Sequence, residues 1–256
     1  MSMTPADLDA LMHSSMPFSR VIGAEALVRW QHPRHGLVLP DKFVPVAEQT
    51  GLIDSLSRYV LAAALGECRQ WREAGFDMSV AVNLSTRNLV DLSLPDDVRL
   101  LLAEAEIAPG SLDLEITESA LLADPLRAAD VVRRLSALGV RIAIDDFGTG
   151  YSSLAHLRRL LVSEIKIDKS FVTTMAANAD DAIIVRSTIE LAHSLGLRVV
   201  AEGIETKVVC DQLRALGCDV GQGYYLGQPV ASGALMEWLW EQRRVAQLGA
   251  EAIATR

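Results

Sequence analysis

Two adjacent aspartates, Asp145 and Asp146, stand at the end of an apolar run and before a glycine-rich loop. Residues 142–144 predict a buried strand, so both carboxyl groups would lie at its mouth, where they repel each other and lose hydration. A divalent cation offsets that cost, and one aspartate can bridge two cations while its neighbour holds the second, as in two-metal phosphoester hydrolysis. An Asx turn with one exposed aspartate explains the pair equally well, so these two residues alone do not decide.

Further polar residues stand at or near the ends of other predicted strands. They are Glu25, Asn83, Glu115, Lys166, Glu202 and Gln222. Each has an ordinary explanation by itself, such as a surface glutamate, a turn cap or a solvated lysine. Together they form an oxygen-rich set that suits hard divalent cations. None of the five histidines, His13 included, stands at the end of a predicted strand, which argues against a zinc site.

Strand-like and helical segments alternate along the chain. The predicted strands are nearly continuous in apolar character, as in a parallel sheet covered on both faces: residues 21–28, 78–84, 112–116, 140–144, 164–167, 197–201 and 220–224. The predicted helices carry apolar residues at helical spacing, and most end at a glycine: residues 55–74, 125–138, 180–195, 206–216 and 232–247. Asp124 is the expected N-cap of the second helix. Trp238 and Trp240, in the last helix, are expected to be packing or interface residues.

Repeated strand–helix units in a chain of 256 residues predict an α/β fold, a TIM-like (β/α)₈ barrel. A doubly wound sheet is the competing interpretation, weakened because the glycine fingerprint of a dinucleotide-binding turn is absent. The segment before residue 21 is short and polar, so an eighth strand is not evident. In a barrel the C-terminal ends of the strands share one rim, where the polar residues would converge.

The composition narrows the class of protein. A hydrophobic content of 50% argues against disorder, and a net charge of −9 argues against sequence-independent binding to DNA or RNA. A phosphate-bearing substrate would therefore need bound cations at the acidic site. The three cysteines lack zinc-site spacing, which indicates reduced thiols in a cytoplasmic protein. No apolar stretch is long enough to span a membrane, and no signal peptide opens the chain.

The polar residues belong to motifs that follow one another in a characteristic order. The stretch EALVRW at residues 25–30 resembles the signature that names the EAL family of cyclic-di-GMP phosphodiesterases. Other stretches between about residue 21 and residue 229 resemble the same family: QHPRHG at 31–36, EQTGL at 48–52, VNLS at 82–85, EITE at 115–118, DDFGTGYSSL at 145–154, KID at 166–168, AEGIET at 201–206 and QGYY at 222–225. The ordered set is far more specific than the EAL tripeptide alone.

The resemblance implies hydrolysis of cyclic di-GMP to linear pGpG with two divalent cations, Mg²⁺ or Mn²⁺. The implied ligands of the first cation are Glu25, Asn83, Glu115 and Asp145, and those serving the second are Asp145, Asp146 and Glu202. The implied catalytic residues are Lys166, Glu202 and Asp146. Lys166 would hold or orient the attacking water, and Glu202 would be either a metal ligand or a general base.

The resemblance also implies how substrate and a partner subunit bind. The implied substrate-binding residues are Leu27, Arg29, Gln222 and Glu205, with the arginine on a phosphate. Glu118 matches an anchor of the loop that starts at Asp146, and residues 151–153 would begin a helix after it. In the family this loop lies near a homodimer interface, which implies a homodimer whose pairing is coupled to metal binding. The alternative is an ordinary βα loop whose glycines serve only the turn.

The N-terminus departs from the family, whose members usually begin with a helix and a strand that ends in Gln-Pro. Residues 1–20 contain no Gln-Pro and offer only a weak helical stretch at residues 5–12. The first strand is therefore expected to be missing, replaced or diverged. The expected organisation is a diverged N-terminal segment at residues 1–20, a single EAL-type barrel domain at residues 21–247 and a C-terminal tail at residues 248–256.

The main rival function is a catalytically silent cyclic-di-GMP receptor or protein-interaction module on the same fold. Such proteins usually lose metal ligands or the lysine, whereas this chain keeps both. Without the resemblance, a divalent-metal lyase or isomerase on a barrel would use similar carboxylates and a lysine. That interpretation gives no reason for the ordered motifs.

Overall fold

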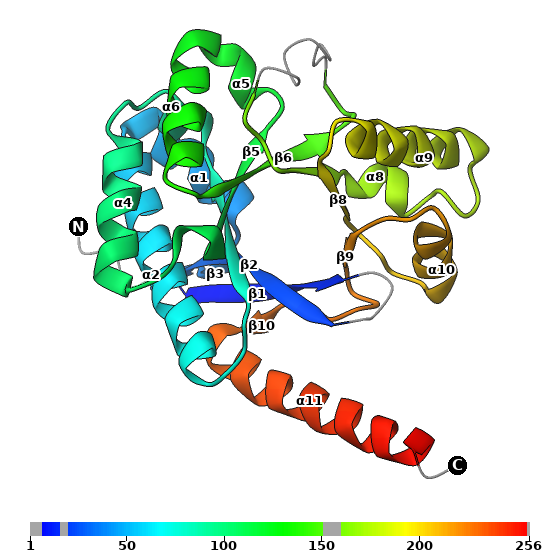
Figure 1. Cartoon of the computed structure of the whole chain (residues 1–256). Coiled ribbons are helices and arrows are strands. Elements are labelled where there is room, and N and C mark those ends of the chain that lie inside the picture. Colours follow the sequence, from blue (N-terminus) through cyan, green and yellow to red (C-terminus); the bar gives the residue numbers. More distant parts are fainter. Residues whose placement is uncertain (1–6, 16–19, 151–159, 255–256) are drawn as a thin grey trace.

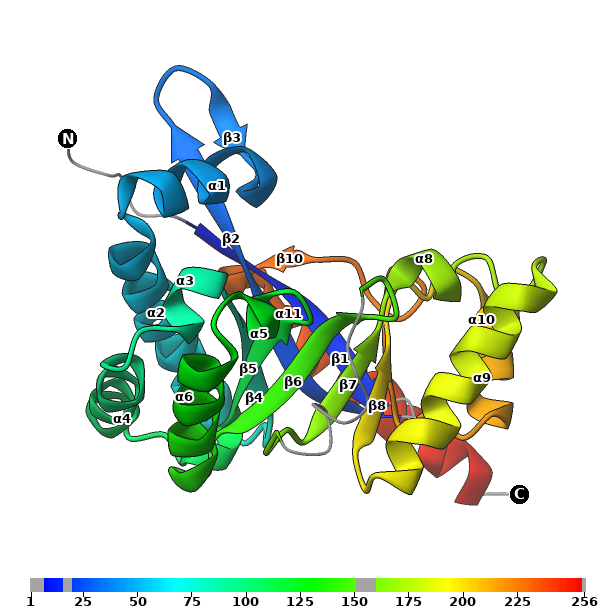
Figure 2. The same cartoon turned by 90° about the horizontal axis from the view of Figure 1, so that it is seen from above.

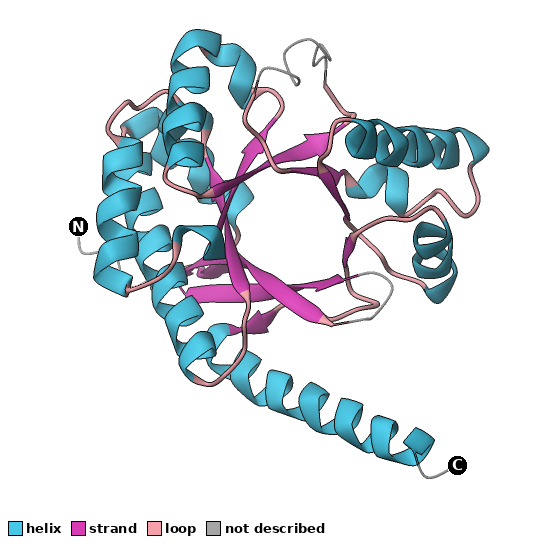
Figure 3. Ribbon diagram, in the orientation of Figure 1, coloured by secondary structure: helices cyan, strands magenta, loops and turns pink. Residues whose placement is uncertain are grey.

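The strands of the protein close into a barrel that helices surround (Figure 1, Figure 3). The computed structural model describes residues 7–15, 20–150 and 160–254. Around the barrel the strands are β1 (Asp7–Ser15), β2 (Val21–His32), β4 (Ser79–Leu84), β5 (Leu112–Thr117), β6 (Arg141–Phe147), β7 (Glu164–Ile167), β8 (Arg198–Ala201) and β9 (Val220–Gln222). The ring is closed because β1 pairs with both β2 and β9. The predicted (β/α)₈-type barrel is therefore confirmed.

All the predicted strands are present, and from β2 to β9 the neighbouring barrel strands are parallel. Two short strands extend the sheet outside the barrel, β3 (Gly36–Val38) beside β2 and β10 (Val230–Ala231) beside β1. β2 continues beyond the predicted end because it forms an antiparallel hairpin with β3. This hairpin projects from the rim of the barrel (Figure 2).

The first strand decides two expectations. The weak helix expected at residues 5–12 is wrong, because Asp7–Ser15 form β1, antiparallel to both neighbours. The first strand, which was expected to be missing, replaced or diverged, is present. Leu8, Ala10 and Met12 are buried and alternate with partly buried or polar residues, which is the period of a strand. An isolated helix of this length would be marginal, whereas a strand here satisfies the exposed backbone edges of β2 and β9 together.

The helices cover the outer face of the barrel. They are α1 (Pro40–Thr50), α2 (Ile53–Glu73), α3 (Thr86–Leu89), α4 (Leu94–Ala105), α5 (Ala120–Ala123), α6 (Pro125–Ala137), α8 (Lys169–Val172), α9 (Ala179–Ser194), α10 (Lys207–Ala215) and α11 (Ser232–Ala254), with a 3₁₀ turn at Pro109–Ser111. Asp124 caps α6 as expected, because its carboxylate accepts a hydrogen bond from the backbone N–H of Arg127. None of the described helices combines the length and apolar character that a bilayer crossing requires.

The C-terminal helix α11 begins against the barrel and then projects from it (Figure 1). Leu235 and Leu239 on its first turns are buried. The ring of Trp240 packs edge-on against Phe76 at a centroid distance of 5.0 Å, and the Arg243 guanidinium lies 5.5 Å from the Trp240 ring. This confirms the expected packing role of Trp240.

Gly223, directly after β9, is a position where only glycine fits. Its φ is +152°, and a Cβ there would overlap the backbone nitrogen and oxygen of Ile204. We expect Gly223→Ala to lower the free energy of unfolding by at least about 2 kcal/mol, because the backbone of the adjacent loop must move. Gly66→Ala is the matched control: nothing lies within 4 Å of its added Cβ in the middle of α2, so about 0.5–1 kcal/mol of stabilisation is expected. Urea denaturation measures both, and equal effects would contradict the steric argument.

Candidate functional site

A fully buried lysine lies at the centre of the predicted site. The ammonium of Lys166 is 2.6 Å from Glu202 Oε1 and 2.8 Å from Glu115 Oε2, with Asp145 Oδ1 at 3.6 Å and Glu25 Oε2 at 3.7 Å. Four carboxyl groups thus surround one ammonium inside the barrel. Because a buried charge needs a partner, this excess of negative charge attracts protons or further cations.

The barrel topology assembles these residues from distant parts of the sequence. Glu115 in β5 pairs in register with Asn83 in β4, and Lys166 lies one residue before the end of β7. Glu202 directly follows β8, and its backbone N–H donates to the carbonyl of Ile167, which extends the β7–β8 pairing by one step. Each side chain therefore faces the interior near the C-terminal end of a parallel strand, as the sequence predicted.

Two amide side chains orient the carboxylate of Glu25. Asn83 Nδ2 donates to Glu25 Oε1 at 2.6 Å, and Gln222 Nε2 donates to Glu25 Oε2 at 2.7 Å. Burial disfavours the charged carboxylate, but the charge of Lys166 and these hydrogen bonds outweigh it and lower the pKa of Glu25. Both amides thus join the cluster as predicted, and Glu25 stays ionised.

Two other carboxyl groups of the cluster hold protons more tightly than usual. Burial and the nearby charge of Glu25 raise the pKa of Glu115 well above its ordinary value, although Lys166 opposes the shift. Burial raises the pKa of Glu202 from 4.5 to about 7, Lys166 opposes the shift, and Asp145 and Glu25 add to it. Protons at these oxygens offset part of the excess negative charge. The donor set is rich in oxygen atoms, and it carries more negative than positive charge. Both properties fit the binding of divalent cations.

The second aspartate of the pair adopts an unusual backbone conformation. Asp146 has φ +54°, in the left-handed region that non-glycine residues rarely adopt, and its N–H donates to Asp145 Oδ1 at 2.9 Å. Burial, with repulsion from Asp145 and Asp168, raises the pKa of Asp146 to about 6. Backbone strain and a raised carboxyl pKa at one residue are typical of a functional position.

The predicted substrate residues on β2 share one face with Glu25. Leu27 and Arg29 follow it at intervals of two residues, and side chains so spaced point to the same side of a strand. The Nε of Arg29 lies 3.0 Å from Asp9 Oδ2 on β1, and both side chains are largely buried. Asp9 was missed by the sequence analysis because its segment was not recognised as a strand.

The last two predicted residues, Glu205 and Glu118, both lie outside the group of carboxylates around Lys166. Glu205 is exposed in the connection between β8 and α10 and is not among the carboxylates around Lys166. Glu118 is buried in the turn after β5, and a Cβ added to Gly150 would lie 2.9 Å from its carboxyl carbon. The carboxyl group of Glu118 therefore lies directly against the loop that starts at Asp146. Residues 151–153, where a helix was expected to begin, lie outside the described residues.

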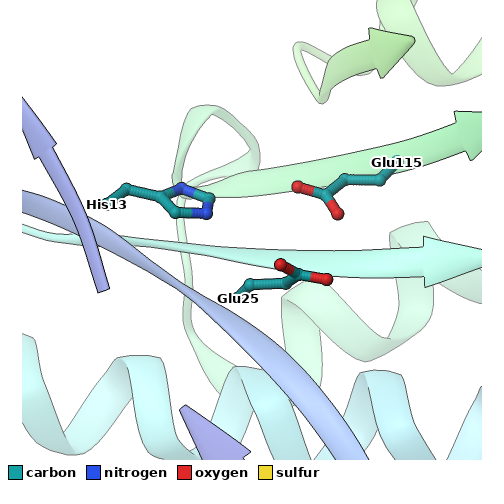
Figure 4. Close-up of side chains that lie close together, drawn as sticks. All are labelled: His13, Glu25 and Glu115. Atoms are coloured by element: carbon teal, nitrogen blue, oxygen red, sulfur yellow. The ribbon is translucent and has the colours of Figure 1, made fainter. Parts of the chain in front are cut away.

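His13 corrects the expectation that no histidine stands near the strand ends. It lies on β1, buried inside the barrel, and pairs across strands with Gly23 and Gln222. One ligand atom each from His13, Glu25 and Glu115 lie within 4.8 Å of one another (Figure 4). Burial, with the positive charge of Lys166, lowers the pKa of His13 to about 4, so the imidazole is neutral. The signal that could have revealed it is the alternation of buried Leu8, Ala10 and Met12, which places His13 on the opposite, inward face.

The sequence of this chain is similar to a known family and to known proteins. Residues 15–229 match the family model described as "EAL domain". The chain is 44% identical over 221 residues to the bifunctional diguanylate cyclase/cyclic di-GMP phosphodiesterase MucR of Pseudomonas aeruginosa, covering 86% of this chain and 32% of that protein. It is 41% identical over 224 residues to the cyclic di-GMP phosphodiesterase PA2567 of the same species, covering 88% of this chain and 38% of that protein. The chain thus spans about a third of these relatives.

A solved structure resembles the barrel closely. It is the PaMucR phosphodiesterase in complex with c-di-GMP, which has a TM-score of 0.86 and 43% sequence identity. The alignment covers 90% of this chain and 94% of that one. The structural similarity therefore extends over most of this chain.

Removal of the buried ammonium tests the charge balance of the cluster. We expect Lys166→Met to lower the free energy of unfolding at pH 8 with chelator by about 3–5 kcal/mol, because the carboxylates lose their buried partner. Saturating Mg²⁺ or Mn²⁺ should restore part of the loss. Lys207→Met is the control: it removes an exposed lysine paired with Asp211 and should leave the free energy of unfolding nearly unchanged. Equal losses in the two variants, measured by urea denaturation, would refute the charge-balance argument.

The raised pKa of Glu202 predicts a pH-dependent stability. A carboxyl group whose pKa rises from 4.5 in the unfolded chain to about 7 in the folded protein binds more protons when folded. Its stabilising contribution is present below pH 4.5 and is lost as the pH rises through 7. With chelator present, we expect the stability of the wild type relative to Glu202→Gln to fall over this range by at most about 1.4 kcal/mol per pH unit. A constant difference in denaturation free energy would contradict the shift.

Proposed function

This chain belongs to the EAL domain family, and we propose that it hydrolyses one phosphodiester bond of cyclic di-GMP, giving linear pGpG. The observation that carries the proposal is the cluster of four carboxyl groups around the buried Lys166, from Glu25, Glu115, Asp145 and Glu202, with Asn83 hydrogen-bonded to Glu25. The relatives that carry this activity in their names span more than this chain does, and the similar solved structure is a complex with c-di-GMP.

The cluster would hold two divalent cations, Mg²⁺ or Mn²⁺. We assign the first to Glu25, Asn83, Glu115 and Asp145, and the second to Asp145, Asp146 and Glu202. When bound, the cations would lower the pKa of a water molecule and offset the charge of the phosphodiester. The excess of carboxyl groups over ammonium groups in the cluster supports this assignment.

Lys166 and Glu202 would act on the attacking water. The ammonium of Lys166 has a pKa raised well above its ordinary value by the surrounding carboxylates, although burial opposes the rise, so it remains a hydrogen-bond donor throughout the physiological range. Glu202 has a pKa of about 7, so its carboxylate can accept the proton of a water near neutral pH. The same oxygens can instead bind a cation directly, in which case the basic role of Glu202 is smaller. The charge on Lys166 is needed under either assignment.

The substrate would bind above this cluster along β2. Arg29 would donate to a non-bridging phosphate oxygen: its Nε pairs with Asp9 and its Nη1 donates to the carbonyl of Val28, which leaves Nη2 with donor capacity. Leu27, on the same face, would offer an apolar contact to the nucleotide. Gln222 would act mainly by orienting Glu25, to which it donates. Glu205 would reach the nucleotide from the exposed loop after β8.

The loop that starts at Asp146 would couple the site to a second subunit. Glu118 would anchor it through the contact with Gly150. Leu122 and Leu126 are 44% and 86% exposed on the neighbouring helices α5 and α6, which supports a homodimer formed on this side of the barrel. Cation binding at Asp145 and Asp146 would then respond to pairing through the loop.

We place the activity in the cytoplasm. Cys68, Cys210 and Cys218 are free thiols, and all three are buried. Burial raises the pKa of Cys218 to about 12, so this thiol is unreactive and suits a reducing compartment.

Product analysis of cyclic di-GMP incubated with Mg²⁺ or Mn²⁺ tests the proposal. We expect the wild type to form pGpG and Glu25→Ala to lose at least about 100-fold in rate, because a cation ligand and the anchor of two amides disappear. Glu73→Ala is the control: it removes an exposed glutamate at the end of α2 and should leave the rate unchanged. No pGpG from a folded protein that still binds the nucleotide would favour the rival function, a catalytically silent receptor.

A further inference from the structure

The imidazole of His13 lies beside the carboxyl groups of Glu25 and Glu115, and a ligand set made only of oxygen atoms gives it no role. His13 is only 6% exposed and its side chain interacts with that of Gln222 on the neighbouring strand, but its Nε2 atom makes no hydrogen bond of good geometry with the described residues. The edge of the ring is turned toward the carboxyl groups of Glu25 and Glu115 (Figure 4). A buried polar atom without a partner is costly, so a functional role is the economical explanation.

We propose that His13 supplies a nitrogen ligand to the cation held by Glu25 and Glu115, and that it shifts the preference of this site from Mg²⁺ toward transition metals such as Mn²⁺ and Co²⁺. The proposal rests on the proposed function for the presence of a cation at these carboxylates. It goes further in naming a donor and a class of metal.

The geometry is favourable for shared coordination. One ligand atom from each of the three residues lies within 4.8 Å of the others, and all three side chains are buried. The residues come from β1, β2 and β5, so the barrel itself fixes their spacing rather than a loop. Glu25 is further held by Asn83 and Gln222, which limits how far its carboxylate can turn away.

The donor chemistry sets the expected selectivity. Mg²⁺ prefers oxygen ligands and binds imidazole weakly, whereas the affinity of nitrogen donors rises along the first transition series from Mn²⁺ to Co²⁺. A site with one imidazole and several carboxylates can still bind Mg²⁺ through its oxygens. The imidazole nitrogen therefore changes the ratio of the affinities for Co²⁺ and Mg²⁺ more than it changes the affinity for Mg²⁺ itself.

Pulsed electron paramagnetic resonance of the Mn²⁺-loaded full chain, without substrate, gives a readout independent of activity. We expect nitrogen coupling to the bound Mn²⁺, with the isotope shift that ¹⁵N-labelled histidine produces. Titrations should show that His13→Gln abolishes this coupling and weakens Co²⁺ binding by at least ~10-fold, with Mg²⁺ affinity changed by less than ~3-fold. His193→Gln, which removes a surface histidine paired with Asp219, should change none of these values.

The wild-type spectrum decides the question even if His13→Gln fails to fold. Bound Mn²⁺ without nitrogen coupling would overturn the inference, and if the same protein forms pGpG the proposed function stands. An equal loss of Co²⁺ and Mg²⁺ affinity in a folded His13→Gln variant would also overturn it, because a residue that only supports Glu25 would weaken both. Failure of the wild type to bind any divalent cation would overturn both proposals.

Discussion

The structure depends on the interaction of one buried ammonium with four carboxyl groups in the interior of the barrel. Lys166 has no exposed surface, and its nearest carboxylate oxygens belong to two different strand ends, at Glu115 and Glu202. A buried ion pair contributes little net stability, because desolvation consumes most of the Coulombic gain. Such a cluster is therefore better explained by the chemistry that it permits than by the stability that it confers.

The closure of the barrel and the chemistry of the site depend on the same strand. β1 pairs with β2 and β9, so it removes the two free edges that the parallel strands would leave. Its outward residues, Leu8, Ala10 and Met12, enter the core, while its inward residues bring Asp9 to Arg29 and His13 to Glu25. The same short N-terminal segment thus supplies both the strand that closes the barrel and two polar contacts of the site.

The parts of the fold that sequence could predict are those with a strong local signal. Most of the strands from β4 to β9 are rich in apolar residues, and α6, α9 and α10 each end just before a glycine, so these elements could be predicted. The sequence did not predict α4, whose C-cap is Glu106 instead of a glycine. The convergence of Glu115, Asp145 and Glu202 could be predicted because parallel strands end on one rim. β1 was not predicted because it has mixed polarity and because one of its partners, β9, is distant in sequence. The sequence analysis also missed the roles of His13 and Asp9, because the side of the strand on which they lie follows only once β1 is recognised as a strand.

The site and the loop above it are linked by backbone geometry at one residue. Asp146 adopts a left-handed conformation that costs a non-glycine residue about 1–2 kcal/mol, and Gly148 follows with φ +100°. Such strain persists only where the surroundings hold it, and here the carboxylate of Asp145 accepts from the strained N–H while Glu118 lies against Gly150. A cation that drew the carboxylate of Asp145 away would weaken the hydrogen bond that holds Asp146. The direction in which the loop leaves the rim is therefore tied to the charge state of the site, and a partner that acts on the loop would act on the cations by the same contact.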